Sequence, residues 1–364
     1  MKRIESLDVF RGLTIALMIL VNNPGNWSHV YAPFLHAEWH GWTPTDLVFP
    51  FFLFIMAVSI PLALGKRMDA GIPKTDLFKK VLIRSVLIFL IGIILELIPS
   101  FDFSTVRIPG VLQRIALVYF ICSMLFIHLS KNQILVSGVL ALILYFVLIT
   151  FVPVPGIGAP NLQPETNLGA WLDRTLLGGH LWSQSKTWDP EGLLGTLPAI
   201  ANGVAGLAVG ILLRKDLDFK YKLLKVFAWG VILSAIGYLW NYTFPINKKL
   251  WTSSFALYTS GVALGFFGVV NFIMEIKGKK GWIAPFKWFG MNAIVLYAGS
   301  VLLAKALDFI QVNDTLSLKS WIYQSLLLPV FSPQLASLVF AMGFVGIFLF
   351  FAYVLFKRKI FIKV

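Results

Sequence analysis

Long apolar runs recur along the whole chain and constrain its fold more than any other feature. A helix needs roughly 20 mainly apolar residues to cross the hydrocarbon core of a bilayer. The 364 residues are 58% hydrophobic and only 13% charged. The apolar runs cover approximately residues 6–23, 46–64, 81–98, 108–129, 133–151, 192–213, 222–240, 251–273, 288–307 and 334–356. The sequence therefore predicts one all-α domain over residues 1–364, a polytopic membrane protein in a lipid bilayer with about ten transmembrane helices.

The distribution of Lys and Arg predicts how these helices are oriented. The formal net charge of +14 is spread over the loops instead of forming one basic arm, which argues against a nucleic-acid partner. Cytoplasmic loops of membrane proteins carry an excess of Lys and Arg. With a cytoplasmic N-terminus, the basic loops 66–80, 214–225 and 277–287 and the basic end 357–363 all lie inside. Both termini are therefore predicted to be cytoplasmic.

Two segments between the apolar runs need separate treatment. The extracytoplasmic loop at about 152–190 is rich in Pro and Gly, but its amphipathic stretch 168–177 indicates an ordered segment on the membrane face. Segment 312–331 is either an amphipathic interfacial helix or an eleventh crossing. An eleventh crossing would carry the basic C-terminal end to the outside, so we favour the interfacial position.

Several ionisable residues fall inside or at the edge of the apolar runs. A cation at the centre of a membrane helix costs about 2.5–3.5 kcal/mol on insertion scales, so such residues are expected to face an internal cavity or a partner. Lys305 is expected to pair with Asp308 near a helix end. Arg84 either reaches the cytoplasmic headgroups or binds an anion, and Arg11 shares a helical face with Asp8.

Arg107 and Arg114 are seven residues apart and therefore lie on one helical face, with Gln113 beside them. Guanidinium groups bind phosphate and carboxylate bidentately. The group is interpreted either as an anion-binding site or as a structural ion pair.

The extracytoplasmic helix ends collect most of the other polar residues. These are Asn22, His36, His40, Asp46, Asp189, Glu191, Asn247, Lys248 and Trp251. Two of the patterns are also typical of helix starts: 43–47 with a Thr cap, and 189–192 with Asp at the N-cap and Pro after it.

The histidines of the first outer loop are the best candidates for catalysis. The spacing of His29, His36 and His40 matches no metal-ligand motif, so no metal is predicted. Histidine titrates near neutral pH, and a carboxylate such as Asp46 fixes its tautomer. A general base or a nucleophile is therefore the favoured role.

These motifs, in the same order from end to end, resemble the transmembrane acetyltransferases of the heparan-α-glucosaminide N-acetyltransferase family, and in particular their compact bacterial members. The matching runs are 6–23, 36–56, 107–114, 188–197, 245–251, 290–299 and 359–364. The resemblance implies transfer of acetyl from cytosolic acetyl-CoA, as co-substrate, to the amino group of glucosamine or a terminal glucosaminide on the far side. It also implies the cytoplasmic (inner) membrane of a bacterium and leaves a homodimer open.

The resemblance also implies roles for single residues. His36 matches the active-site histidine, in a His-Ala-x-Trp context ten residues before Asp46, and Asn22 matches the asparagine beside it. Acetyl-CoA is expected at Arg84, Arg11, Arg114 and Gln113. The sugar, free or derived from a glycosaminoglycan, is expected at Arg107, His40, Asp189, Glu191, Asn247, Lys248, Trp251 and Asn292. His40 stands where the family often has Asn, so its part beside His36 is open.

Two other functions use the same features. The intramembrane charges are also typical of an amino-sugar permease, although no inverted repeat supports that reading. An O-acetyltransferase of a cell-envelope glycan would keep the chemistry and change the acceptor. Whether the acetyl group passes through His36 or moves directly within a ternary complex is also open.

Overall fold

The computed structural model describes residues 4–362 and is all-α, with no β-strand in that range. The long helices are α1 (Glu5–Asn22), α2 (Val48–Asp69), α3 (Lys74–Leu97), α4 (Val111–His128), α5 (Lys131–Phe151), α7 (Thr196–Arg214), α8 (Phe219–Trp240), α9 (Ser253–Asn271), α11 (Ala293–Phe309) and α13 (Pro333–Lys357). The short elements are the 3-10 helices η1 (Ala32–Phe34) and η2 (Pro44–Leu47), the helices α6 (Leu168–Leu177), α10 (Ala284–Met291) and α12 (Leu318–Trp321), and the π-helices η3 (Phe272–Ile276) and η4 (Ile322–Leu327).

Seven of the described helices are long and apolar enough to cross a membrane, and the bent pair α10–α11 would make an eighth. The protein is therefore an integral membrane protein. Among the predicted spans, α1 and α3 fall outside this set, and both carry several charged residues. The two helices of the bent pair meet at 85°, so the predicted run 288–307 is interrupted at Asn292.

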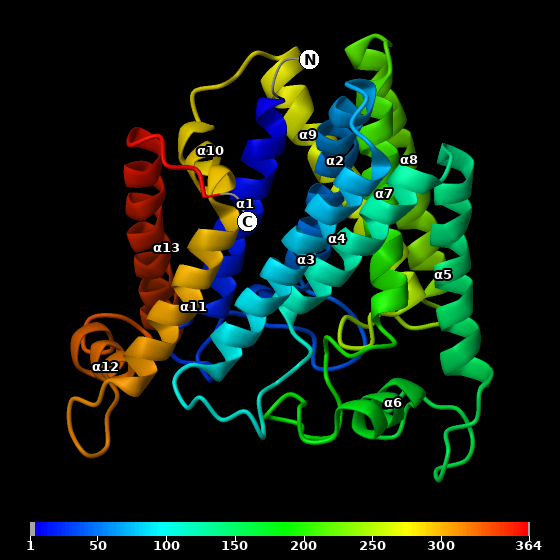
Figure 1. Ribbon diagram of the computed structural model, residues 1–364. Coiled ribbons are helices and arrows are strands. Elements are labelled where there is room, and N and C mark those ends of the chain that lie inside the picture. The colour runs from blue at the N-terminus through cyan, green and yellow to red at the C-terminus, as the bar shows by residue number, and fades with distance from the viewer. Residues whose placement is uncertain (1–3, 363–364) are drawn as a thin grey trace.

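The bundle has two distinct ends (Figure 1). The N-terminus and the end of α13 lie at one end, which we call the N-terminal end, with the α2–α3 connection. The long loops, α6 and α12 lie at the other end, which we call the α6 end. The basic loops 66–80, 214–225 and 277–287 connect helices at the N-terminal end.

Helix α1 is partly polar, and close backbone packing against α10 stabilises it. A Cβ added at Gly12 would lie 1.7 Å from the carbonyl oxygen of Phe286, and one at Gly290 would lie 1.9 Å from that of Asp8. Only glycine permits this approach at either position. Helix α10 is thereby fixed against α1, which also fixes the break that follows α10.

The loop predictions have different outcomes. The predicted stretch 168–177 forms α6 with the same bounds, and segment 312–331 contains only α12 and η4, which are too short to cross a bilayer. The helix start predicted at 189–192 is wrong, because α7 begins at Thr196 and Asp189 is used as a side-chain partner.

The predicted pair of Lys305 and Asp308 is also wrong. Lys305 Nζ donates to the carbonyl oxygens of Leu95 and Ile98, at 2.6 and 2.7 Å, where α3 ends. Unpaired carbonyls at a helix C-terminus are strong acceptors for a cation, and this interaction replaces the local ion pair. Asp308 lies 3.8 Å from Lys319 instead.

Replacing Gly12 by Ala should lower the thermal unfolding midpoint of the purified protein in detergent, because the new methyl group meets backbone atoms that cannot move aside. Overpacking of this kind costs about 1–3 kcal/mol. The matched control is Gly343→Ala in α13, where nothing lies within 4 Å of an added Cβ. That variant should unfold at the wild-type temperature or above it. Equal midpoints for the two variants would contradict the close packing of α1 on α10.

Candidate active site

The centre of the site is a histidine held by a buried carboxylate at the α6 end. His36 Nδ1 lies 2.6 Å from Asp46 Oδ1. Asp46 Oδ2 accepts hydrogen bonds from the backbone N–H groups of Ala37 and Thr43, at 3.1 and 2.9 Å. Asp46 is the third residue of η2 and completes a capping box with Thr43, so the predicted Thr cap is present. The carboxylate therefore fixes the imidazole with Nδ1–H donating and leaves Nε2 free as an acceptor.

The surroundings of His36 favour the neutral imidazole. Although 37% of its side chain stays accessible, neighbouring atoms exclude water and lower the pKa below its usual 6.5. The positive charge of Lys248 lowers the pKa further, whereas Asp46 raises it. A neutral imidazole with a free Nε2 is the form that accepts a proton or attacks a carbonyl carbon at neutral pH.

His40 contacts Asn247 of loop 245–250 and not the carboxylate that holds His36. Its Nδ1 lies 3.4 Å from Nδ2 of the buried Asn247, and its pKa is lowered by loss of water. Two further hydrogen bonds join the same loops: Gly41 N–H donates to the Ile246 carbonyl at 2.7 Å, and Lys249 Nζ donates to the Glu38 carbonyl at 2.6 Å. Within residues 4–362, His40 has no hydrogen bond to His36. Loop 245–250 thus supports the loop that carries His36.

An ionic cluster lies next to this loop. Arg107 binds both oxygens of Asp189, with distances of 2.8 and 2.6 Å, and one oxygen of Glu191 at 2.6 Å. Lys248 Nζ lies 4.0 Å from the other oxygen of Glu191, and Glu96 lies 3.8 Å from Arg107. Burial alone would raise the pKa of Glu191, but Lys248 and Arg107 hold it below its usual range. The cluster links the end of α3 to loops 152–195 and 245–250.

Arg114 has a supporting role at the same end. Its guanidinium donates to the carbonyls of Pro190 and Gly192, at 3.3 and 2.7 Å, and lies 4.9 Å above the ring of Trp251. It is 2% exposed, and its Nε has no partner among the described residues. Arg114 therefore binds backbone carbonyls of the turn at 189–192. In the described part of the chain, it does not form the structural ion pair that was one of the two sequence-based interpretations.

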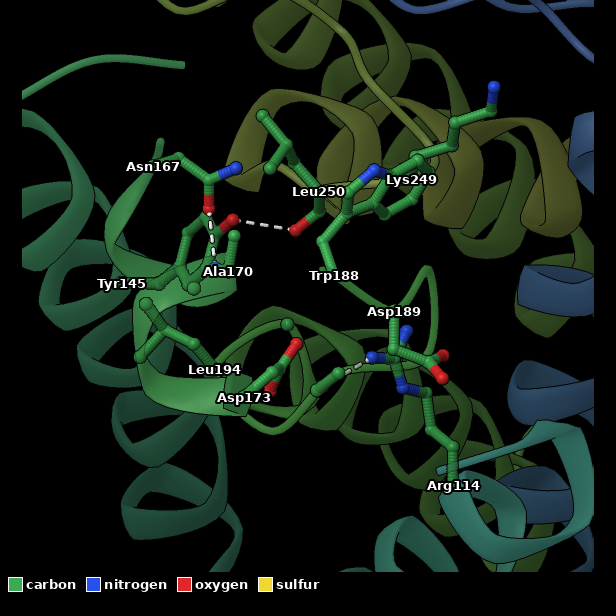
Figure 2. Close-up of a pocket in the computed structure, with 13 residues that line it drawn as sticks. Arg114, Tyr145, Asn167, Ala170, Asp173, Trp188, Asp189, Leu194, Lys249 and Leu250 are labelled. Carbon is green, nitrogen blue, oxygen red and sulfur yellow. Dashed lines mark hydrogen bonds between the residues drawn. The ribbon is translucent and has the colours of Figure 1, made fainter. Parts of the chain in front are cut away.

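Figure 2 shows Arg114 beside a cavity of about 20 Å³, enough for one water molecule. Asp173 and Tyr145 also line this cavity. Burial raises the pKa of Asp173 to about 6, and its Oδ1 accepts a hydrogen bond from Leu193 N–H at 2.9 Å. Asp173 is a polar neighbour of Arg114 that the sequence did not reveal, because it lies on α6, 59 positions along the chain from Arg114.

The other predicted site residues are distributed over both ends. Asn22 is the exposed last residue of α1, and no described hydrogen bond joins it to His36. Trp251 is fully buried and donates from Nε1 to Asn202 at 2.9 Å, so it positions neighbours. Gln113 is buried against Gly92. Asn292 lies at the break between α10 and α11, away from the α6 end.

A larger cavity of about 640 Å³ opens toward the N-terminal end between α1, α2, α3, α4 and the α10–α11 break. Four cations line it: Arg11, Arg67, Lys80 and Arg84. Arg11 donates to Ser59 Oγ at 2.8 Å, and Arg84 lies 5.0 Å above the ring of Tyr119. Arg11 and Arg84 were predicted from the sequence as anion-binding candidates, whereas Arg67 and Lys80 were not. The four-residue spacing of Lys80 and Arg84 on one helical face was the available signal.

Helix α2 and the preceding η2 connect the cavity wall to Asp46, the carboxylate that holds His36. Phe52 lines the cavity and follows Asp46 by six residues, which is about 9 Å along a helix. The cavity wall therefore extends along α2 toward the carboxylate that holds His36. No group of three or more His, Cys, Asp or Glu residues in the described chain is arranged to hold a metal ion.

The sequence is similar to those of known proteins. A family model described as the catalytic region of heparan-α-glucosaminide N-acetyltransferase matches residues 3–167. The heparan-α-glucosaminide N-acetyltransferases of Mus musculus and Homo sapiens are each 30% identical to this chain over 418 aligned residues. The alignments cover 100% of this chain, which spans 60% of the length of each of these curated relatives.

Replacing Arg107 by Met should strongly lower the thermal unfolding midpoint, because Asp189 would remain buried without its cation and Glu191 would keep only the more distant Lys248. Breaking a buried pair in this way costs about 3–5 kcal/mol. The control is Arg214→Met, which removes an ion pair to Asp69, whose side chain is 68% exposed. That loss should cost about 0–1 kcal/mol. A midpoint for Arg107→Met as high as that of the control would show that the cluster does not hold the α6 end together.

Proposed function

Because this chain belongs to the family of the heparan-α-glucosaminide N-acetyltransferase catalytic region, we propose that it transfers acetyl from acetyl-CoA to an amino group across the membrane. The acceptor is glucosamine or a terminal glucosaminide. One observation carries the proposal: a histidine fixed by a buried carboxylate lies at the α6 end, and the wall of a cation-lined cavity reaches Phe52, six residues after that carboxylate.

In this proposal the protein lies in the inner membrane of a bacterial cell. Its N-terminal end faces the cytoplasm, and its α6 end faces outward. The basic loops favour this orientation. Helices α1 and α3 complete ten crossings, counting α10–α11 as one. Their charged residues are compatible with crossing because Arg11, Lys80 and Arg84 all line the cavity, where a ligand or water can solvate them.

Acetyl-CoA enters from the cytoplasm and places its phosphates among Arg11, Arg67, Lys80 and Arg84. Guanidinium and ammonium groups bind phosphate oxygens through charge-assisted hydrogen bonds. The apolar wall beyond them, which includes Phe52, suits the less polar arm of the molecule. The thioester then lies toward His36.

The chemistry centres on the free Nε2 of His36. In the direct route, Nε2 takes a proton from the ammonium of the sugar, the amine attacks the thioester carbonyl, the C–S bond breaks, and the CoA thiolate takes up a proton. In the two-step route, Nε2 itself attacks and releases the thiolate, and the acetyl-imidazole then acylates the amine. Asn22, through its side-chain amide, is assigned to the developing oxyanion, a contact worth about 3–4 kcal/mol.

The acceptor binds beside the ionic cluster. Arg107 orients Glu191 and Asp189, and Lys248 lies 4.0 Å from Glu191 and lowers the pKa of His36. Carboxylates are suited to an ammonium group and sugar hydroxyls. Asn247 and Trp251 are buried, so they act by positioning the loop that supports His40.

Replacing His36 by Ala should reduce CoA release from acetyl-CoA and glucosamine by at least about 10²-fold, because the proton acceptor or nucleophile is lost. His40→Ala is the matched control and should keep most of the wild-type rate.

Replacing glucosamine by glucose, which lacks the amine, should abolish product formation and so distinguishes N-acetylation from O-acetylation. Parallel double-reciprocal plots with varied acceptor would support the two-step route. An active His36→Ala together with an inactive His40→Ala would refute the assignment.

The acid limb of kcat/KM should have its midpoint below pH 6.5, because His36 must be neutral and its surroundings lower its pKa. Lys248→Gln removes a charge that lowers this pKa, so the limb should shift to higher pH. The neighbouring substitution Lys249→Gln serves as the control and should leave the limb in place. A limb that moves to lower pH in Lys248→Gln, or moves equally in both variants, would contradict the role of His36 as the titrating base.

A further inference from the structure

The chain after α13 turns back across the N-terminal end of the bundle. The short segment 358–362 leaves the end of α13 and runs inward beside α10 (Figure 1). Ile362 lines the 640 Å³ cavity. The last described residues of the protein are therefore part of the wall of the cation-lined cavity.

The reversal is built into the end of α13. Lys359 has a φ of 55°, a left-handed conformation that is uncommon for a residue with a side chain. Its N–H donates to the Phe356 carbonyl at 3.0 Å, and the next N–H, of Ile360, donates to the Leu355 carbonyl at 2.9 Å. This is the pattern of a Schellman helix end, which redirects the chain back along the helix.

Asn292 holds the redirected segment. Its Nδ2 donates to the Ile360 carbonyl at 3.0 Å, and its Oδ1 accepts from the Ile362 N–H at 2.9 Å. The side-chain amide thus pairs with two backbone groups, as the backbone of a neighbouring strand would. Asn292 is 1% exposed and lies at the 85° break between α10 and α11. A buried amide at a helix break needs such partners, and here the C-terminal segment supplies them.

The segment is held at these points but is otherwise only weakly packed. Ile360, Phe361 and Ile362 are 41%, 38% and 48% exposed. The start of the segment is fixed more firmly, since Trp288 of α10 packs on Tyr353 of α13 at a ring distance of 4.9 Å. Segments with few buried contacts open at low free energy, so 360–362 can leave the wall while α13 stays in place.

We propose that segment 358–362 is a strap that closes the cavity at the N-terminal end, with Asn292 as the positioning residue that latches it. The strap opens to admit a ligand and closes to retain it. The identity of that ligand, a CoA thioester, rests on the proposed function. The closure itself rests only on the contacts of Asn292 and on the position of Ile362.

The closure is tested by access of a reagent to the cavity. Met56 lines the cavity, and the native Cys122 is fully buried, so a Met56→Cys variant reports on entry. The purified full chain in detergent is treated with a charged methanethiosulfonate reagent. Removal of residues 360–364, or Asn292→Ala, should raise the modification rate about tenfold, as expected for losing two hydrogen bonds. Combining both changes should add nothing further, because both act on one contact.

The matched control is Asn271→Ala in the same Met56→Cys background. Asn271 is also 1% exposed and also makes two side-chain hydrogen bonds, to Ser6 and to the Phe267 carbonyl, but it does not contact the strap. Its modification rate should match that of the parent. Size-exclusion profiles establish that each variant is folded. Modification rates that the truncation leaves unchanged would overturn the proposal.

A second readout separates the strap from the proposed function. In the truncated chain, the dissociation constant of CoA and the KM for acetyl-CoA should both rise about tenfold, while kcat at saturation is kept. A wild-type protein that binds no CoA would refute the proposed function, and the modification rates would still decide whether the strap closes the cavity. Unchanged CoA affinity together with a raised modification rate would overturn the retention role of the strap.

Discussion

The geometry of the α6 end depends on one buried cation, Arg107. It holds Asp189 and Glu191 of the long loop, and Glu191 in turn lies near Lys248 of the loop that docks on residues 38–41. The position of His36 therefore follows from a series of contacts that starts at an arginine more than seventy residues away. Charges removed from water at a membrane surface need partners of this kind, because unpaired they would cost several kcal/mol.

The two ends of the bundle use cations differently. At the α6 end, Arg107 and Arg114 are already occupied by protein carboxylates and carbonyls, so they shape the site. At the N-terminal end, Arg67, Lys80 and Arg84 line a cavity large enough for a sizeable ligand. In the proposed function, this division assigns anion binding to one side of the membrane and proton transfer to the other. An enzyme that joins substrates from opposite sides requires that separation.

The sequence predicted the elements that depend on local patterns, and it failed where distant groups compete. The amphipathic period of 168–177 gave α6 with its bounds, and the Thr-Pro-x-Asp pattern gave the cap that holds Asp46. The start of α7 was misplaced because Asp189 bonds to Arg107 and not to a helix N-terminus. The partner of Lys305 was predicted wrongly because pairing was considered only with residues nearby in the sequence. The carbonyls at the end of α3 that it binds lie about 210 positions away. The spacing of His36 and Asp46 agrees with their contact, whereas the strap contact of Asn292 spans 68 positions and leaves no sequence pattern.

The bond from Lys305 to the last carbonyls of α3 has a mechanical consequence. Helices α3 and α10–α11 form two walls of the large cavity, and this lysine fastens α11 to α3 at the α6 end. Two rods joined at one end separate most at the other, so relative motion of these walls is expected to be largest at the N-terminal end and smallest at the α6 end. The contact of Lys305 thus serves as a pivot, and a small angular change between α3 and α10–α11 widens the cavity more at the N-terminal end than at the α6 end.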